Sequence, residues 1–250
     1  MTSDKQQQIT VGVLALQGSF REHISHMEKL IQSLKHDPSY ANKLISVKPV
    51  RTPIDLQQID GLIIGGGEST TISILLQRTG LLKPLQDLIQ NQKLPTWGTC
   101  AGLILLCDEV TNTKIQLGDL TYKTIGGLDV SVERNSFGRQ LESFTENVPC
   151  AGFTNSALDS FDCVFIRAPV IKSTVVSSGK LKENSVRSGR KVHAGEAPAQ
   201  VLATVSRNGE DLVVAVRKGK ILGTSFHPEL IENYGFHKWF LDEFVIRNSI

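Results

Sequence analysis

The sequence predicts an α/β protein built on one doubly wound, mostly parallel or mixed sheet flanked by helices. The segment ITVGVLAL at 9–16 is almost continuously apolar and rich in β-branched residues, which is typical of a strand buried on both faces of a parallel sheet. A strand, a glycine-containing turn and a helix follow one another at 61–71 and again at 95–106. Such repeated units indicate a parallel sheet whose functional residues lie at the carboxyl ends of the strands.

The chain has 250 residues, 40% hydrophobic and 21% charged, so it can bury a substantial core, and we expect one domain over 1–250. A formal net charge of +2 without basic runs argues against a nucleic-acid partner. The polar start and the lack of any apolar run of transmembrane length predict a cytoplasmic protein with no signal peptide and no membrane partner. The four cysteines show no metal-ligand spacing, so we expect free thiols, no metal and no cofactor.

The first half of the chain supplies the expected parallel strands. After the strand at 9–16, Gln17 begins a turn into a helix whose apolar residues recur at the helical period. We interpret His23 and His26 in this helix as solvated or internally satisfied, because metal-binding imidazoles would need partners that the neighbourhood lacks. Further strands are expected near 44–50 and at 61–64, and the second leads into the turn GGGESTT, which opens the next helix.

Cys100 lies between Gly98 and Gly102, where a short strand is expected to give way to an apolar helix. This pattern is the cysteine version of the G-x-S-x-G nucleophile turn. The glycines let strand and helix approach closely, and the helix N-terminus brings its positive dipole to the sulfur. We therefore expect a reactive thiol, with a buried structural cysteine as the alternative.

The second half of the chain changes to short alternating strands. We expect them near 125–132, 140–144, 164–166, 201–205, 212–216 and 221–224, as antiparallel or mixed additions to the same sheet, with a hairpin turn at 217–220. The polar segment at about 172–200 is expected to be a surface insertion with little core of its own. An amphipathic helix at about 234–247 closes the chain.

His227 and Glu229 follow the last expected strand. Because Pro228 favours an extended chain at His227, the side chains of His227 and Glu229 project to the same side. Glu229 can then orient the imidazole while the other ring nitrogen faces a thiol, which predicts a Cys100–His227–Glu229 relay for acyl transfer. The alternative is a strand-end histidine with an unrelated carboxylate nearby.

An acyl-transfer site also needs donors for the oxyanion. The turn at Gly66 and Gly67 can supply backbone N–H groups, and the Ala101 N–H follows the nucleophile directly. The same turn could be a phosphate loop, but it lacks both the G-K-[ST] and the G-x-G-x-x-G patterns. We therefore favour the oxyanion interpretation.

Six motifs together resemble one known family, the glutaminase subunits of pyridoxal 5′-phosphate synthase. They are VLALQGSFREH at 13–23, GGGESTT at 65–71, TWGTCAG at 96–102, VERNSFGRQ at 132–140, FIRAP at 165–169 and SFHPE at 225–229. The resemblance covers nearly the whole chain and implies the flavodoxin-like fold of class I, triad-type glutamine amidotransferases.

The resemblance implies roles for individual residues. Cys100 would attack the side-chain amide of L-glutamine to form a thioester and release ammonia, with His227 and Glu229 completing the triad. The positions that hold glutamine in the family correspond here to Gly67, Glu68, Ser69, Arg134, Ile166 and Arg167. Gln17 lies in a segment that couples partner docking to the oxyanion turn.

The resemblance also implies a partner. The ammonia would pass to a separate synthase subunit, a (β/α)₈ barrel that builds pyridoxal 5′-phosphate from a pentose phosphate and a triose phosphate. Gly65 stands where the family usually has proline, and the 172–200 insertion is longer than in compact members. Two alternatives stay open: a triad amidotransferase that serves another synthase, and a catalytically idle regulatory paralogue.

Overall fold

One half of the central sheet is parallel, as predicted. The computed structural model describes residues 6–113, 116–134, 143–174, 184–190, 196–207 and 209–248. The parallel strands run in the order β2-β1-β3-β4-β15. They are β1 (Gln7–Leu14), β2 (Lys43–Val50), β3 (Gly61–Ile64), β4 (Thr96–Thr99) and β15 (Ile221–Thr224). The connections that follow β1, β3 and β4 carry α-helices that pack on the faces of the sheet, so the doubly wound fold class is confirmed.

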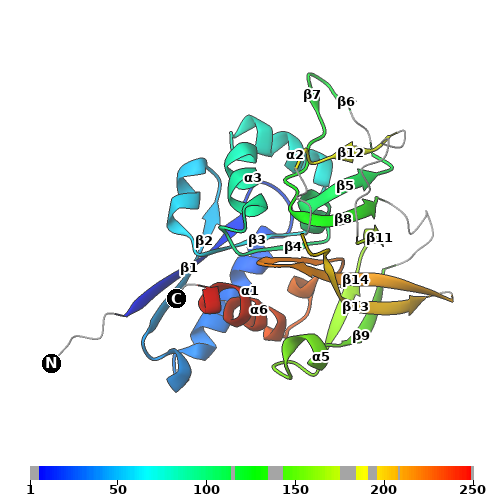
Figure 1. The fold of residues 1–250 in the computed structure, drawn as a ribbon. Coiled ribbons are helices and arrows are strands. Elements are labelled where there is room, and N and C mark those ends of the chain that lie inside the picture. The colour runs from blue at the N-terminus through cyan, green and yellow to red at the C-terminus, as the bar shows by residue number, and fades with distance from the viewer. Residues whose placement is uncertain are drawn as a thin grey trace.

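Helices cover both faces of this sheet (Figure 1). One face carries α1 (Phe20–Leu34) and α6 (Gly235–Phe240), and the other carries α2 (Ser69–Arg78), α3 (Leu82–Gln90) and α4 (Ala101–Leu106). Successive strand residues point to opposite faces: Val13 packs with α1 and α6, whereas Leu14 packs with α2, α3 and α4. Burial on both faces explains why the strands read as continuous apolar runs.

The other half of the sheet is mixed. β15 pairs antiparallel with β14 (Glu210–Lys218), and β13 (Gln200–Arg207) also pairs with β14. The sheet continues through β11 (Val170–Ser173), β8 (Leu128–Glu133), β5 (Cys107–Thr111) and β12 (Val186–Arg187). The expected hairpin at 217–220 joins β14 to β15, with Gly219 at a φ of 56°. These strands are additions to the central sheet, as expected.

One pairing expectation was wrong. The strand expected at 164–166 belongs to β10 (Ser160–Phe165), which pairs with β9 (Phe144–Pro149) in a separate two-stranded sheet instead of extending the main one. Phe161, Cys163 and Phe165 on one side of β10 are buried in the core on the α1 and α6 face. Alternation in the sequence shows which side of a strand is buried but not which strand it pairs with. The expected strand residues 140–142 lie outside the described residues.

The remaining elements are short. They are β6 (Gln116–Leu117), β7 (Leu120–Thr121), α5 (Ala151–Thr154) and the 3₁₀ helices η1 (Pro38–Tyr40), η2 (Pro53–Gln58) and η3 (Pro228–Leu230). The closing helix predicted at 234–247 is present but irregular: α6 continues as the π-helical η4 (Leu241–Val245) and the 3₁₀ turn η5 (Ile246–Asn248). No helix in the described part of the chain is long and apolar enough to cross a membrane.

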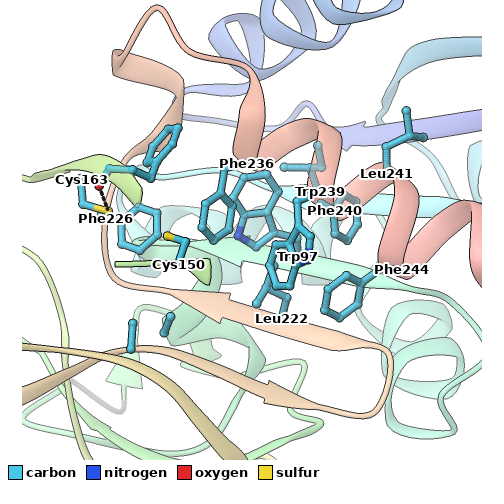
Figure 2. Close-up of a cluster of buried hydrophobic side chains, with 14 of the residues drawn as sticks. Trp97, Cys150, Cys163, Leu222, Phe226, Phe236, Trp239, Phe240, Leu241 and Phe244 are labelled. Carbon is cyan, nitrogen blue, oxygen red and sulfur yellow. Dashed lines mark hydrogen bonds between the residues drawn. The ribbon is translucent and has the colours of Figure 1, made fainter. Parts of the chain in front are cut away.

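Aromatic side chains of the closing helix form the core on one face of the sheet (Figure 2). The Trp97 ring, which β4 supplies, lies 5.3 Å from the Phe236 ring and 5.5 Å from the Phe240 ring. The indole N–H donates to Thr224 Oγ1 on β15 at 3.0 Å, so this buried donor is satisfied. The cluster therefore fixes β4 and β15, the two strands that precede Cys100 and His227.

The segment expected as a surface insertion includes an edge strand, β12, which pairs with β5. Just beyond it, the Arg190 guanidinium contacts Asp108 at 2.7 Å and Glu196 at 2.7 Å, and its side chain is only 7% exposed. The described parts of this segment are therefore joined to the central sheet by backbone pairing and by buried charges.

Candidate active site

Cys100 occupies a strained turn between β4 and α4. Its φ is 47° and its ψ is −102°, a conformation that non-glycine residues rarely adopt, and its N–H donates to Thr224 O at 2.8 Å. A Cβ on Gly102 would lie 1.9 Å from Ile64 O, and one on Gly98 would lie 2.5 Å from the Gly102 carbonyl carbon. Both positions therefore require glycine for strand and helix to approach this closely, as the elbow interpretation requires.

His227 and Glu229 follow β15, and their side chains meet as the spacing predicts. His227 Nδ1 lies 2.8 Å from Glu229 Oε1, and Glu229 is buried. Burial alone would lower the pKa of His227, but hydrogen bonding with the Cys100 and Glu229 side chains outweighs it and raises that pKa to about 10. Since Nδ1 is held by Glu229, Nε2 is the ring nitrogen left to serve Cys100.

Burial alone would also raise the pKa of Glu229. The neighbouring His23 and His227 outweigh this effect and lower the pKa to about 2. Glu229 is therefore ionised at neutral pH and favours the protonated ring of His227.

A cavity of about 330 Å³ opens at the carboxyl ends of the strands. Eight residues singled out from the sequence line it: Gly67, Glu68, Ser69, Cys100, Arg134, Ile166, Arg167 and His227. Ile104 and Pro169 complete the lining. The cavity therefore brings a thiol, an imidazole and two guanidinium groups to one space.

Arg134 is held in place on one wall of the cavity. Its guanidinium donates to Glu68 Oε1 at 3.0 Å and to Thr113 Oγ1 at 2.7 Å, and it lies over the Tyr122 ring, 5.5 Å from the centroid. The other Glu68 oxygen accepts the Thr71 N–H at 2.7 Å at the start of α2. Burial alone would raise the pKa of Glu68, but hydrogen bonds from Thr71 and Thr70, together with Arg134, lower it.

The glycine-rich turn packs against the first turn of the chain and against His227. The Glu68 N–H donates to Gln17 Oε1 at 2.9 Å, and the Ser19 N–H donates to Gly66 O at 2.9 Å. A Cβ on Gly66 would lie 2.4 Å from His227 Cε1. Gln17 and Gly66 thus lie behind the cavity wall, and Ala101, the first residue of α4, is buried beside Cys100.

Arg167 has a φ of 46°, so the FIRAP segment also enters the cavity in a left-handed conformation. Ile166 beside it is partly exposed. Only Arg134 and the two residues before it represent the VERNSFGRQ motif in the structure, since 135–140 lie outside the described residues.

Sequence reasoning missed several residues around the cavity: Ile104, Thr113, Tyr122 and Pro169. No local signal marked Tyr122, because its place beneath Arg134 depends on how β8 and the preceding loop pack. Within the described residues, no group of three or more histidine, cysteine or acidic side chains could hold a metal ion.

The fold and the cavity together define the class of protein. A solved structure titled as a glutamine amidotransferase is 37% identical to this chain, covers 93% of it and 97% of its own length, and superimposes with a TM-score of 0.66. A doubly wound sheet of this kind, with a cysteine at a nucleophile elbow, is accordingly the glutamine amidotransferase fold of class I type.

The chain belongs to the SNO glutamine amidotransferase family, whose model matches residues 13–246. It is 41% identical over 237 residues to the pyridoxal 5′-phosphate synthase subunit SNO1 of Saccharomyces cerevisiae, covering 94% of this chain and 92% of the relative. It is 40% identical over 237 residues to the pyridoxal 5′-phosphate synthase subunit PdxT of Paenarthrobacter aurescens, covering 93% and 91% respectively.

Proposed function

We propose that this chain is the glutaminase subunit of a pyridoxal 5′-phosphate synthase, which hydrolyses L-glutamine and supplies the ammonia to a synthase subunit. Family membership and the names of its relatives support the activity and its place in vitamin B6 biosynthesis. The observation that carries the proposal for the site is the convergence of Cys100, His227 and the six glutamine-binding candidates on one cavity.

Glutamine would enter as a zwitterion beside the Arg134–Glu68 ion pair. The Arg134 guanidinium can bind the substrate α-carboxylate, and the Glu68 carboxylate can bind its ammonium group. The single Arg134–Glu68 ion pair would then be replaced by two ion pairs with the substrate. Arg167 lies on the same cavity and adds a second guanidinium. This arrangement leaves the side-chain amide to extend toward Cys100.

In the first step, Cys100 Sγ attacks the amide carbon and the carbonyl oxygen becomes an oxyanion. The C–N bond then breaks, and the departing nitrogen takes a proton from His227, which a pKa of about 10 keeps protonated at neutral pH. The products of this step are a glutamyl thioester on Cys100, neutral His227 and ammonia. The N–H groups of Ala101 and of the turn at Gly66 and Gly67 would stabilise the oxyanion.

In the second step, water adds to the thioester carbon and gives a proton to His227. The C–S bond breaks, glutamate leaves, and Cys100 and protonated His227 are restored. Glu229 keeps Nδ1 of His227 protonated and the ring oriented in both steps.

The relatives are named as subunits of pyridoxal 5′-phosphate synthase, so we propose a separate (β/α)₈ synthase subunit as the partner that consumes the ammonia. Gln17 Oε1 accepts the Glu68 N–H and so connects the turn after β1 to the glycine-rich turn at 65–67. Docking of the synthase subunit near Gln17 would change the position of the glycine-rich turn through this hydrogen bond. We place the complex in the cytoplasm, where the four buried thiols stay reduced.

The test is ammonia release from glutamine, measured with and without the barrel subunit. We expect release by the wild type with its partner, and loss of release in Cys100→Ala and His227→Asn. Lys83→Ala, on an exposed side chain far from the cavity, is the control that keeps full activity. An inactive wild type in the assembled complex would favour an idle paralogue, and activation by a different synthase would favour another acceptor.

A further inference from the structure

A second buried histidine lies behind the predicted triad. His23 on α1 is fully buried, and its Nε2 lies 3.4 Å from Glu229 Oε2, the oxygen that His227 does not contact. The Glu229 carboxylate therefore lies between two imidazoles that come from opposite ends of the chain. Among the described residues, Glu229 Oε2 has no hydrogen bond of regular geometry. The group that donates to this oxygen would therefore determine the orientation of the carboxylate.

The partners of His23 settle which nitrogen carries its proton. Nδ1 lies 3.0 Å from His237 Nε2, and Nε2 lies 3.2 Å from Thr99 Oγ1. If the proton were on Nδ1, the Nε2 lone pair would face the Glu229 carboxylate, and His237 would bury an N–H on Nδ1, which lacks a hydrogen-bond partner among the described residues. If the proton is on Nε2, two acceptors are within reach: Thr99 Oγ1 lies at 3.2 Å in hydrogen-bond geometry, and Glu229 Oε2 lies at 3.4 Å. His237 then donates to His23 Nδ1. In the second arrangement only His237 Nδ1, acting as an acceptor, lacks a hydrogen-bond partner among the described residues. An unpaired acceptor costs less free energy than an unpaired buried N–H or a lone pair that faces a carboxylate.

The surroundings keep His23 neutral. Burial lowers its pKa, and the nearby His26 and His227 act in the same direction, against the opposing charges of Glu229 and Glu22. Burial also lowers the pKa of His237 well below its ordinary value. The Trp97 ring lies 5.9 Å from the His23 ring and 5.1 Å from the His237 ring, so the pair is enclosed by the aromatic core.

We propose that His23 is a positioning residue for the glutaminase reaction: its neutral imidazole donates from Nε2 to Glu229 Oε2 and thereby fixes the carboxylate that orients His227. The proposal rests on the proposed function of the Cys100 site. His23 does not touch the substrate, so its loss should reduce kcat through the orientation of His227 and leave glutamine capture by Arg134 and Glu68 unchanged.

Two variants of similar size separate the two ring nitrogens. In His23→Gln the side-chain amide reaches the position of Nε2 and can still donate to Glu229, whereas in His23→Asn it reaches only the position of Nδ1. We expect His23→Gln to keep kcat within about threefold and His23→Asn to lose about tenfold to a hundredfold, because one hydrogen bond to a charged group is removed. KM for glutamine should be unchanged in both, and the acidic limb of the kcat profile should move to higher pH in His23→Asn. Equal kcat values for the two variants, or a loss confined to KM, would overturn the proposal.

Ser19 is the competing donor, since its hydroxyl also faces Glu229. Ser19→Ala should keep kcat close to the wild-type value, and a loss as large as that of His23→Asn would assign the role to Ser19 instead. The exposed His36, in the turn just after α1, provides the control: His36→Asn removes a histidine side chain outside the site and should have no effect on kcat.

A measurement without catalysis decides the hydrogen bond itself. Long-range ¹H–¹⁵N correlation spectra of the ¹⁵N-histidine-labelled wild type, assigned with the single variants, should show His23 as the Nε2–H tautomer, unchanged from about pH 6 to 9. An Nδ1–H tautomer or a charged ring would overturn the proposal, even if the variants fail to fold. Failure of the proposed function would appear separately, as a wild-type complex that releases no ammonia.

Discussion

Gly66 sets how closely the glycine-rich turn approaches the His227 ring. A methyl group there would lie 2.4 Å from Cε1, so Gly66→Ala must displace the imidazole or the turn. We expect kcat for glutamine hydrolysis to fall about a hundredfold, since misplacement by about 1 Å has an effect of that size. Gly152→Ala is the matched control, because a Cβ at Gly152 meets nothing within 4 Å, and it should keep full activity. A Gly66→Ala enzyme with wild-type kcat would show that the turn can give way without moving His227.

Arg134 is held by Glu68 and Thr113 before any substrate arrives, so its guanidinium is positioned in advance for a carboxylate. We expect Arg134→Ala to raise KM for glutamine about tenfold to a hundredfold with a smaller change in kcat, since Cys100 and His227 are untouched. Steady-state kinetics of the complex measure this difference. An unchanged KM would show that Arg134 does not bind glutamine. Arg187→Ala is the control, because the ion pair between Arg187 and Glu109 lies outside the cavity.

The positions of the candidate catalytic residues could be predicted because each had a local signal. The glycines around Cys100 and the two-residue spacing of His227 and Glu229 are readable from neighbouring positions. His23 had no such signal, because its contact with His237 joins positions 214 residues apart. The sequence showed only an amphipathic helix there, and the meaning of its histidine depends on the packing of the closing helix.

β12 and the residues after it are joined to the sheet by a network of buried and half-buried charges. Arg190 contacts Asp108 and Glu196, and Lys218 on β14 contacts Glu196 at 3.0 Å. Arg190→Met leaves the buried Asp108 without its cation, whereas Glu196 keeps Lys218, so we expect a loss of about 3 kcal/mol in the free energy of unfolding, measured with urea. Lys83→Met breaks an exposed pair with Asp87 and should cost less than about 0.5 kcal/mol. Equal effects of the two substitutions would mean that the Arg190 network does not stabilise the fold.

The parallel strands were predictable as elements because burial on both faces leaves a continuous apolar run. The antiparallel strands were harder to predict from the sequence. β9 and β10 pair with each other, and their position against the core depends on the burial of Phe161 and Phe165. The helix after Cys100 ends at Leu106 and β5 begins at Cys107, although the apolar residues continue across the boundary. Periodicity alone cannot separate a short buried helix from a buried strand.

Acid should unfold the whole molecule through His23 and His237. Both are held neutral in the folded state with pKa values below the ordinary 6.5, so the unfolded chain binds more protons as the pH falls below 6.5. The free energy of unfolding should therefore fall by about 1.4 kcal/mol per pH unit for each group below that value. Urea unfolding at several pH values should show a shallower acid slope in His237→Met than in the wild type. The same slope in His237→Met as in the wild type would mean that His237 is protonated in the folded chain.

High pH should lower the free energy of unfolding through His227, whose pKa is raised and not lowered. Its folded pKa of about 10 lies above the ordinary 6.5, so its contribution to stability is complete below 6.5 and is lost as the pH rises to about 10. The wild type should lose its advantage over His227→Gln across this range in the same urea experiments. A constant difference between the two proteins would show that the raised pKa is absent.

β15 is the last strand along the described chain, yet it lies between β4 and β14 in the middle of the sheet. During synthesis on the ribosome, Cys100 is therefore made long before His227, and the growing polypeptide contains the thiol without the histidine that the proposed reaction requires. Insertion of β15 joins the two halves of the sheet and brings His227 to the elbow in the same event. A truncation before residue 221 would accordingly divide the sheet in two, so the enzyme acquires its tertiary structure and its chemistry together.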